Sequence, residues 1–355
     1  MKFIYAGVVA LVAALASLLL TGRFRRYALA RGVMDVPNAR SSHQRPTPRG
    51  GGVAIVITVL LALAALGILH LVAWKFIGGL MSAGAVAAAV GYADDRKTVS
   101  VLTRLASHFA AAALAIALIG IAPVSSELHL TAAFGFLAPV LGAFYLVWML
   151  NLTNFMDGID GLASLEVITV CVGGVLCALL YKYRIGVPLL AQFGEMNSAM
   201  SAALFAPLLL AAATAGFMFW NWPPAKIFMG DAGSGFLGIT LGILSLIAAV
   251  AAPQLLWSWL ILMSVFIADA TVTLISRIVR REKFYRAHRS HAYQHAALRW
   301  GHQRTTLAVG AINVCWLMPL ALGVATTRLD AFVALAMAYI PLAALALLLR
   351  AGLPD

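Results

Sequence analysis

The sequence predicts an all-α, polytopic integral membrane protein with about eleven transmembrane helices. Of its 355 residues, 63% are hydrophobic and only 11% are charged, whereas a soluble domain carries about a quarter charged residues. The mean hydropathy is +0.94, and apolar runs recur along the whole chain. These observations exclude a soluble enzyme with one membrane tail. We expect a single membrane-embedded domain over residues 1–355.

The expected helices follow from the length of the apolar runs, because a bilayer core about 30 Å thick needs about 20 apolar helical residues. Polar or Gly/Pro breaks place them at 3–21, 51–71, 76–92, 105–122, 133–152, 162–181, 200–221, 234–252, 254–275, 307–326 and 331–349. The first run resembles a secretory signal, but the arginines that follow it at 23–31 would resist translocation. We expect it to be a retained helix.

Basic residues orient these helices. With the N-terminus outside and the C-terminus inside, 20 of the 25 Lys and Arg residues lie on the inner side, as the positive-inside rule requires. The inner loops are then 22–50, 93–104, 153–161, 222–233 and 276–306, and we expect them to form the active face. The net charge of +12 therefore reflects topology, and the expected partner is the lipid bilayer with no nucleic acid.

Acidic residues gather on this inner face. Six of them fall at inner helix ends or in inner loops: Asp94, Asp95, Asp157, Asp160, Asp231 and Asp269. A carboxylate near the hydrocarbon costs about 2.5–3.5 kcal/mol on insertion scales and is by default a functional residue. Solvation of helix ends explains any one of them, but it does not explain six on one face.

Two adjacent carboxylates, Asp94 and Asp95, end the third expected helix. Neighbouring carboxylates repel each other, which favours a shared cation or proton. The alternative is a solvated helix end whose charges pair with Arg96 and Lys97.

A second segment carries Asn151, Asn154 and Asp157 at a spacing of three, followed by Asp160. On a helix this spacing lines one side, and the glycines at 158 and 161 allow the backbone to approach a ligand. Hard oxygen ligands suit Mg²⁺ and its phosphate partners. An Asn-rich turn between helices is the alternative.

A glycine-rich segment, residues 226–235, opens the eighth expected helix. Backbone N–H groups at such a helix N-terminus suit a phosphate. Asp231 lies there and is the expected ligand of the metal that accompanies the phosphate. Without this carboxylate, the segment would be an ordinary entry to a membrane helix.

The last inner loop carries His288, Arg289, His291 and His295, and the histidine spacing predicts one helical face. No Cys or acidic residue completes a zinc shell. A basic His/Arg face instead fits a diphosphate or anionic lipid headgroups.

These segments together resemble the polyprenyl-phosphate N-acetylhexosamine-1-phosphate transferases, over nearly the full length. The resemblance rests on Asp35-Val-Pro-Asn38, Arg45-Pro-Thr-Pro-Arg49-Gly-Gly-Gly, Asp94-Asp95, Asn151 to Gly161, Phe228-Met-Gly-Asp231-Ala-Gly-Ser and His288-Arg289-Ser290-His291. It implies transfer of N-acetylhexosamine-1-phosphate from a UDP-N-acetylhexosamine to polyprenyl (undecaprenyl) phosphate, with release of UMP. Mg²⁺, with Mn²⁺ as a substitute, is the implied cofactor, and a homodimer is compatible with the family. The implied location is the bacterial inner membrane, with the site facing the cytoplasm.

The resemblance also implies roles for individual residues. Asp231 would bind Mg²⁺ beside Asn154. The remaining substrate-binding residues would be Arg49, Asn151, Asp157, Asp160, Phe228, His288, Arg289 and His291, with Asp157 and Asp160 on the nucleotide, Phe228 on uracil, and His288 and His291 on the diphosphate. Asp94 or Asp95 would lie by the lipid phosphate as its base or orienting group.

The histidines are sparser here than in the peptidoglycan-precursor branch of the family, so the sequence looks more like the initiators of O-antigen and capsule synthesis. The sugar stays open. A phospho-MurNAc-pentapeptide transferase is the alternative within the family. A secondary transporter is the alternative outside it, but transporter carboxylates cluster near the membrane midplane.

Overall fold

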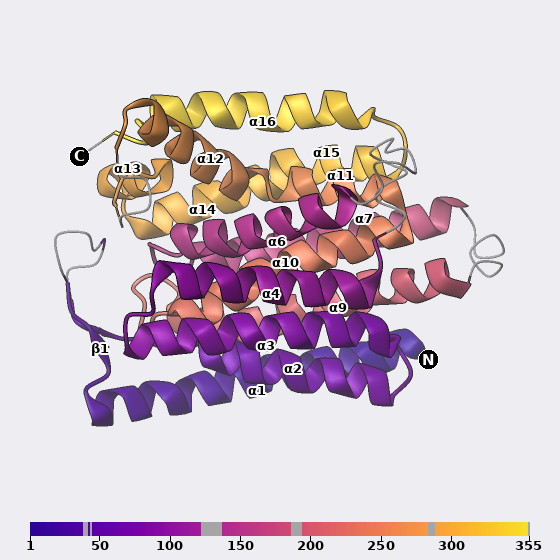
Figure 1. Ribbon diagram of the computed structural model, residues 1–355, viewed down its shortest axis with the longest axis horizontal. Coiled ribbons are helices and arrows are strands. Elements are labelled where there is room, and N and C mark those ends of the chain that lie inside the picture. The colour runs from indigo at the N-terminus through magenta and orange to yellow at the C-terminus, as the bar shows by residue number, and fades with distance from the viewer. Residues whose placement is uncertain (38–41, 43–44, 122–136, 186–193, 283–287, 354–355) are drawn as a thin grey trace.

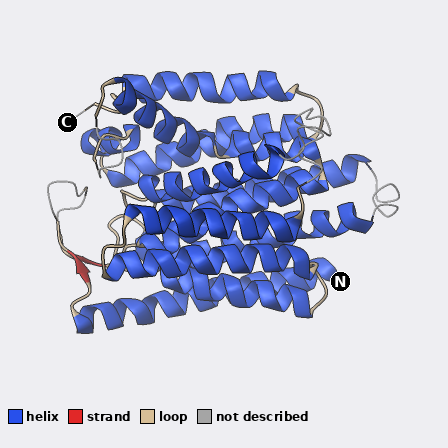
Figure 2. Ribbon diagram, in the orientation of Figure 1, coloured by secondary structure: helices blue, strands red, loops and turns tan. Residues whose placement is uncertain are grey.

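The computed structural model describes residues 1–37, 42, 45–121, 137–185, 194–282 and 288–353. Within these residues the chain is a bundle of helices, with one short antiparallel ladder between β1 (Met34–Asp35) and β2 (Thr47–Pro48) (Figure 2). The predicted all-α class is therefore confirmed.

The helices begin and end as follows: α1 Lys2–Arg31, α2 Gly52–Ile68, α3 Trp74–Arg96, α4 Val101–Ile119, α6 Leu137–Met156, α7 Leu162–Ile185, α9 Gly194–Asn221, α10 Asp231–Ala251, α11 Pro253–Leu262, α12 Ser264–Val279, α13 Ala292–Trp300, α14 His302–Ile312, a π-helical turn Asn313–Leu317, α15 Met318–Ala325 and α16 Ala331–Leu348. Helix α1 begins at one end of the bundle and α16 ends at the other (Figure 1).

Nine helical segments among the described residues are long and apolar enough to cross a membrane, with α14 to α15 counted as one. Helices α11 and α12 form one further candidate span, but they are bent by 67° at their junction, and α2 is a shorter apolar helix. A polytopic membrane protein is therefore confirmed. The count of eleven and the inside–outside orientation stay predictions.

Several helices extend past the spans expected from hydropathy. Helix α1 continues to Arg31, α3 continues through Asp94 and Asp95, and α6 continues to Met156. Apolar run length measures the hydrocarbon thickness, whereas a helix can continue into the polar interface with all its backbone groups paired. The predicted loops at 22–50, 93–104 and 153–161 are accordingly shorter than expected.

Helix α10 forms the centre of the bundle. Every residue of it from Ala232 to Ala251 is buried, and only Asp231 at its start is partly exposed. Helices α3, α6, α9, α2 and α11 pack around it. Glycines on its surface allow close approach: a Cβ on Gly238 would lie 2.5 Å from the Met149 carbonyl oxygen of α6. Since α10 starts at Asp231, the central helix places this carboxylate where the surrounding helices end.

Candidate active site

The predicted inner ends of the helices enclose a polar cavity of about 230 Å³. Its described lining comprises Asp35, Ser42, Arg49, Asn154, Asp157, Gly158, Ile159, Asp160, Asn221, Phe228, Met229, Gly230, Asp231, Ser234, Gln294 and His302. Segments more than 250 residues apart in the sequence thus meet at one place.

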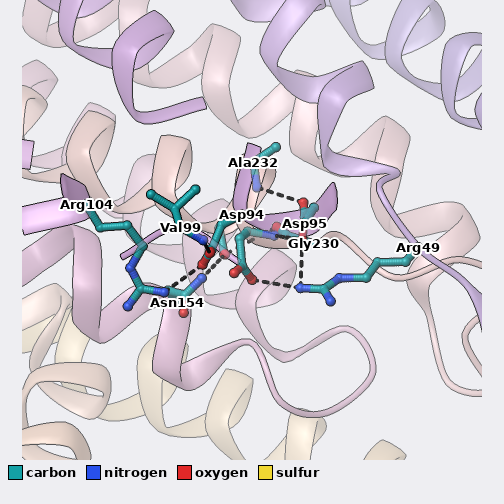
Figure 3. A network of polar contacts seen from close by, with 10 residues as sticks. Arg49, Asp94, Asp95, Val99, Arg104, Asn154, Gly230 and Ala232 are labelled. Atoms are coloured by element: carbon teal, nitrogen blue, oxygen red, sulfur yellow. Dashed lines mark hydrogen bonds and ion pairs between the residues drawn. The ribbon is translucent and has the colours of Figure 1, made fainter. Parts of the chain in front are cut away.

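The start of α10 is fixed from α3. Gly230 has a φ of 79° at the N-cap, a conformation that favours glycine. The Asp95 carboxylate accepts hydrogen bonds from the backbone N–H groups of Asp231 at 3.1 Å and Ala232 at 3.2 Å (Figure 3). Asp95 therefore caps a helix to which it does not belong, and it holds Asp231 in place.

Arg49 bridges two of these carboxylates. Its Nη2 atom lies 2.7 Å from Asp95 Oδ1 and 3.0 Å from Asp231 Oδ1 (Figure 3). Burial lowers the pKa of Arg49, but the two carboxylates raise it more, so its pKa lies above the ordinary value. The guanidinium is a permanent positive charge beside Asp231.

Residues around Arg49 are held by backbone pairing with the segment before α10. The N–H groups of Gly51 and Gly52 donate to the carbonyls of Phe228 and Met229, each at 2.9 Å, and the Phe228 N–H donates to the Pro48 carbonyl at 2.8 Å. This pairing explains why the Arg-Gly-Gly-Gly segment and the Phe-Met-Gly-Asp segment form one site.

Asn154 and Asp157 face this centre from the end of α6. Asn154 Nδ2 donates to Ser234 Oγ at 2.9 Å, which leaves the amide oxygen as its remaining polar group. Burial, and then the nearby charge of Asp231, raise the pKa of Asp157 well above its ordinary value. The spacing of Asn151, Asn154 and Asp157 predicted that all three lie on one side of a helix. Helix α6 ends at Met156, so Asp157 is the first residue after it.

The donor set fits a hard divalent cation. Among the described residues, no three His, Cys, Asp or Glu side chains are arranged to hold a metal ion. Mg²⁺ instead takes one or two carboxylates and completes its shell with water and phosphate oxygens. The carboxylate of Asp231 and the amide oxygen of Asn154 match that requirement, and Asp157 lines the same cavity.

Asp160 also lines the cavity and pairs with His302 of α14. His302 Nδ1 is 3.2 Å from Asp160 Oδ1, and His302 Nε2 is 3.1 Å from the Ser42 carbonyl oxygen. Because a carbonyl only accepts, Nε2 carries hydrogen. Asp160 Oδ2 also accepts from the Ala225 N–H at 2.9 Å.

A second, more open cavity of about 750 Å³ adjoins the first and shares Ser42, Asp160, Phe228 and His302 with it. Its lining includes Arg45, Arg289, Arg304 and Trp300. Phe228 thus lies between a carboxylate-rich space and an arginine-rich space, and Arg289 contributes to the latter.

Asp94 and Asn151 lie on a third, smaller cavity of about 20 Å³, together with Asn154 and Asp231. Asp94 is paired with Arg104 at 2.6 Å and accepts from the Val99 N–H at 2.7 Å (Figure 3). Asn151 donates to the Val147 carbonyl of its own helix at 2.7 Å. Asp94 and Asp95 therefore contact different residues, although they are adjacent in sequence.

The prediction that the three histidines share one helical face is wrong. His288 and Arg289 precede α13 and His291 is its N-cap, whereas His295 Nε2 lies 3.2 Å from the Leu353 carbonyl oxygen. The cause is Asp269, whose carboxylate accepts the first two N–H groups of α13 at 3.0 and 2.9 Å and so starts the helix after His291.

His291 and His288 form a cluster beside the cavity. His291 Nδ1 lies 3.2 Å from Asp269 Oδ1, and the two imidazoles stack with centroids 5.1 Å apart. Tyr293 donates to the Phe155 carbonyl at 2.9 Å, which ties the cluster to the end of α6. Neither histidine is part of the described lining of the 230 Å³ cavity.

The sequence reasoning missed His302, Arg104 and Gln294. Gln294 caps α13 and lines the cavity. All three are polar residues near the start of a helix. Counting the basic residues of the inner loops does not distinguish them from the other polar residues there. A Gly followed by His302 just before a long apolar run was the available signal for a helix N-terminus at the inner face. Asn38 of the first motif lies outside the described residues.

Comparison with known proteins decides the family. Residues 77–249 match the family model described as glycosyl transferase family 4. The chain is 30% identical to the decaprenyl-phosphate N-acetylglucosaminephosphotransferase of Mycolicibacterium smegmatis, over 90% of this chain and 81% of that protein. It is 29% identical to the probable undecaprenyl-phosphate N-acetylglucosaminyl 1-phosphate transferase of Bacillus subtilis, over 85% of this chain and 80% of that protein.

The chain belongs to the polyprenyl-phosphate N-acetylhexosamine-1-phosphate transferase family. It is also 30% identical to the phospho-N-acetylmuramoyl-pentapeptide-transferase of Kocuria rhizophila, over 67% of this chain and 71% of that protein. A transferase of this family therefore replaces the transporter alternative, and both transferase branches are represented among its relatives.

Proposed function

We propose that the protein transfers N-acetylglucosamine-1-phosphate, or a close N-acetylhexosamine analogue, from its UDP-sugar to polyprenyl phosphate and releases UMP. The observation that carries this proposal is the meeting of Asp157, Asp160, Asp231, Asn154 and Arg49 in one polar cavity at one end of an apolar bundle. Carboxylates and a guanidinium at a membrane boundary match a nucleotide diphosphate, its cation and a lipid phosphate.

We propose Mg²⁺, with Mn²⁺ as a substitute, as the cofactor, held by Asp231 and Asn154. Bound there, the ion would neutralise phosphate charge and orient the diphosphate. The hydrogen bond from Asn154 to Ser234 orients the amide, and Asp95 holds the Asp231 backbone. Arg49 supplies a second positive charge for the diphosphate.

Asp157, Asp160 and Phe228 are the proposed nucleotide contacts. Phe228 lies between the two cavities, so its ring offers a stacking surface for uracil. The arginines of the second cavity provide charge-assisted hydrogen bonds to anionic or hydroxyl groups of the sugar nucleotide. The histidine cluster of His288 and His291 adds positive charge beside the diphosphate only when its imidazoles are protonated.

In the proposed reaction, an oxygen of the polyprenyl phosphate attacks the β-phosphorus of the UDP-sugar. The new phosphorus–oxygen bond forms as the bond to the UMP oxygen breaks, and UMP leaves with the electron pair. A phosphomonoester has a second pKa near 6, so at neutral pH the nucleophile is already largely a dianion. Asp94 and Asp95 are both engaged with basic groups and N–H donors, which favours an orienting role over a base.

The O-antigen or capsule pathway is the proposed setting, with the site facing the cytoplasm of the bacterial inner membrane. The sparse histidines support it, and so does the basic excess on the inner loops. A homodimer stays a prediction from the family resemblance.

The deciding experiment is transfer in membranes that contain the protein, undecaprenyl phosphate and one of a panel of UDP-N-acetylhexosamines. We expect a lipid-linked sugar diphosphate and UMP with UDP-GlcNAc, dependent on Mg²⁺. Product only with UDP-MurNAc-pentapeptide would replace the proposal with the peptidoglycan branch. A phosphorylated enzyme trapped with UDP-sugar alone would replace direct attack with two displacements through an aspartyl phosphate.

A further inference from the structure

A buried polar cluster lies between α7 and the π-helical turn that follows α14, and its residues line none of the cavities described above. Asn313 Nδ2 donates to Glu166 Oε2 at 2.7 Å and to Thr169 Oγ1 at 2.8 Å. Glu166 and Asn313 are each 1% exposed. A carboxyl group at such a position in a membrane protein is costly when ionised and is not expected without a role.

Within the part of the chain that the structure describes, two side-chain oxygens of this cluster have no hydrogen-bond partner. They are Glu166 Oε1 and Asn313 Oδ1, and both are acceptors if the carboxyl group is ionised. A single proton on Glu166 Oε1 would turn this atom into a donor, and Asn313 Oδ1 of the same cluster is an acceptor that it could pair with. Protonation would also remove the buried charge, and burial penalises both an unpaired polar atom and an unpaired charge.

The cluster lies at one end of a line of contacts that leads to the active site. We call this line the seam; it runs from Asp160 and His302 to Glu166 and Asn313. From the inner end outward, Asp160 meets His302, the Thr306 hydroxyl donates to the Asp160 carbonyl at 3.0 Å, and Gly310 packs on Leu165, where a Cβ would lie 2.7 Å from the leucine Cδ2. Glu166 and Asn313 are the next contact along the same two helices.

Asn313 is also where the helix changes. Helix α14 ends at Ile312 and the π-helical turn begins at Asn313. A π-helical turn is rare and often marks a functional position. The side chain of Asn313 therefore fixes α14 to α7 at the point where the regular α-helical hydrogen bonding stops.

We propose that Glu166 is a positioning residue: protonated and paired with Asn313 through two hydrogen bonds, it holds α14 in register on α7 and so keeps His302 against Asp160. This inference rests on the proposed function for its kinetic consequence, since Asp160 is a proposed nucleotide contact. The pairing itself does not depend on the substrate.

The pairing is tested by infrared spectroscopy of the purified protein. Wild type should show a protonated carboxylic acid band that is absent from Glu166→Gln and shifted in Asn313→Ala. A carboxylate band for Glu166 at neutral pH would overturn the proposal.

The positioning role is tested by kinetics. Glu166→Leu should raise KM for the UDP-sugar about three- to tenfold with little change in kcat, as expected for one lost buried hydrogen-bonded contact. Glu166→Gln, which keeps an acceptor and supplies a donor, should restore KM. Ser245→Ala, which removes the buried 2.8 Å contact between Ser245 and Tyr145 on α10 and α6, is the matched control and should leave KM unchanged.

A double-mutant cycle joins the two ends of the seam. If Glu166 acts through His302, adding Glu166→Leu to His302→Ala should raise KM no further, and the two changes should also be non-additive in Tm. Additive effects in both would overturn the proposal. Absence of transfer by the wild-type protein would instead count against the proposed function, and the infrared band and the Tm cycle would still decide the seam.

Discussion

The imidazole of His302 and the carboxylate of Asp160 lie 3.2 Å apart, although 142 residues separate them in the chain. Asp160 follows α6 and His302 starts α14, so this pair closes the cavity between two distant helices. Asp160 and His302 line both the 230 Å³ cavity, which is rich in carboxylates, and the 750 Å³ cavity, which is rich in arginines. Substitutions of this pair therefore test nucleotide binding.

Replacement of His302 by Ala should raise KM for the UDP-sugar about tenfold, the effect of one lost hydrogen bond to a charged group. Asp160 would lose the partner that orients it. Steady-state kinetics with varied UDP-sugar measures the effect. His70→Ala, at the opposite end of the bundle, is the control. An equal rise in KM in this variant would contradict the proposed role of His302 in holding Asp160.

Asp231→Asn should lower kcat at least about a hundredfold, because the proposed Mg²⁺ site loses its carboxylate and the diphosphate loses electrostatic stabilisation. A Mg²⁺ titration of the variant measures it. The control is Asp330→Asn at the N-cap of α16, where the carboxylate accepts two backbone N–H groups and Asn also caps well. Wild-type turnover by Asp231→Asn at ordinary Mg²⁺ would contradict the site.

Arg49→Lys should lower activity about tenfold even though the charge is kept, because a lysine ammonium group is more strongly hydrated and does not reproduce the planar group whose Nη2 lies between the two carboxylates. The native guanidinium contacts both Asp95 and Asp231. Transfer assays with Arg49→Lys and Arg49→Ala measure the effect, and the alanine variant should be the weaker. Equal activity in the lysine variant would show that charge alone suffices.

Gly91→Ala should destabilise the protein by about 1–3 kcal/mol, the usual cost of overpacking, and should reduce turnover. The new Cβ would lie 2.6 Å from the Ala232 nitrogen, at the backbone that Asp95 holds. Gly78→Ala on the same helix is the matched control, since its Cβ would meet only Leu118 at 3.7 Å. Thermal unfolding in detergent measures both, and equal Tm values would refute the close packing.

The stability of the protein should fall as pH falls from about 6.5 to about 4. Burial, followed by the positive charges of His291 and Arg277, lowers the pKa of His288 to about 4, against an ordinary value near 6.5. In that window the unfolded chain binds a proton that the folded protein does not, so acid favours unfolding. The free energy of unfolding, measured by denaturation at each pH, should depend less on pH in His288→Gln. An identical pH dependence in the two proteins would show that His288 is not its cause.

Hydropathy predicted the helical class and the polytopic membrane character, because apolar run length is a strong signal in a membrane protein. The roles of the candidate site residues stay predictions, but most of these residues lie together. Asp231, Asn154, Asp157, Asp160, Phe228 and Arg49 do meet in one cavity. The partners of the carboxylates were not predictable, since they depend on which helices pack together. Asp95 capping α10 and Asp269 capping α13 are contacts between separate helices, and the second of them removed the expected histidine face.

Helix α10 carries Asp231 at its start, and from Ala232 to Ala251 it is buried against the surrounding helices. Its position is therefore set by protein alone, and changes in bilayer thickness or acyl composition act first on the helices around it. With polyprenyl phosphate as the proposed acceptor, two effects of the membrane on the reaction can be distinguished. Lipid composition should alter how readily the acceptor arrives, while the geometry at Asp231 stays the same.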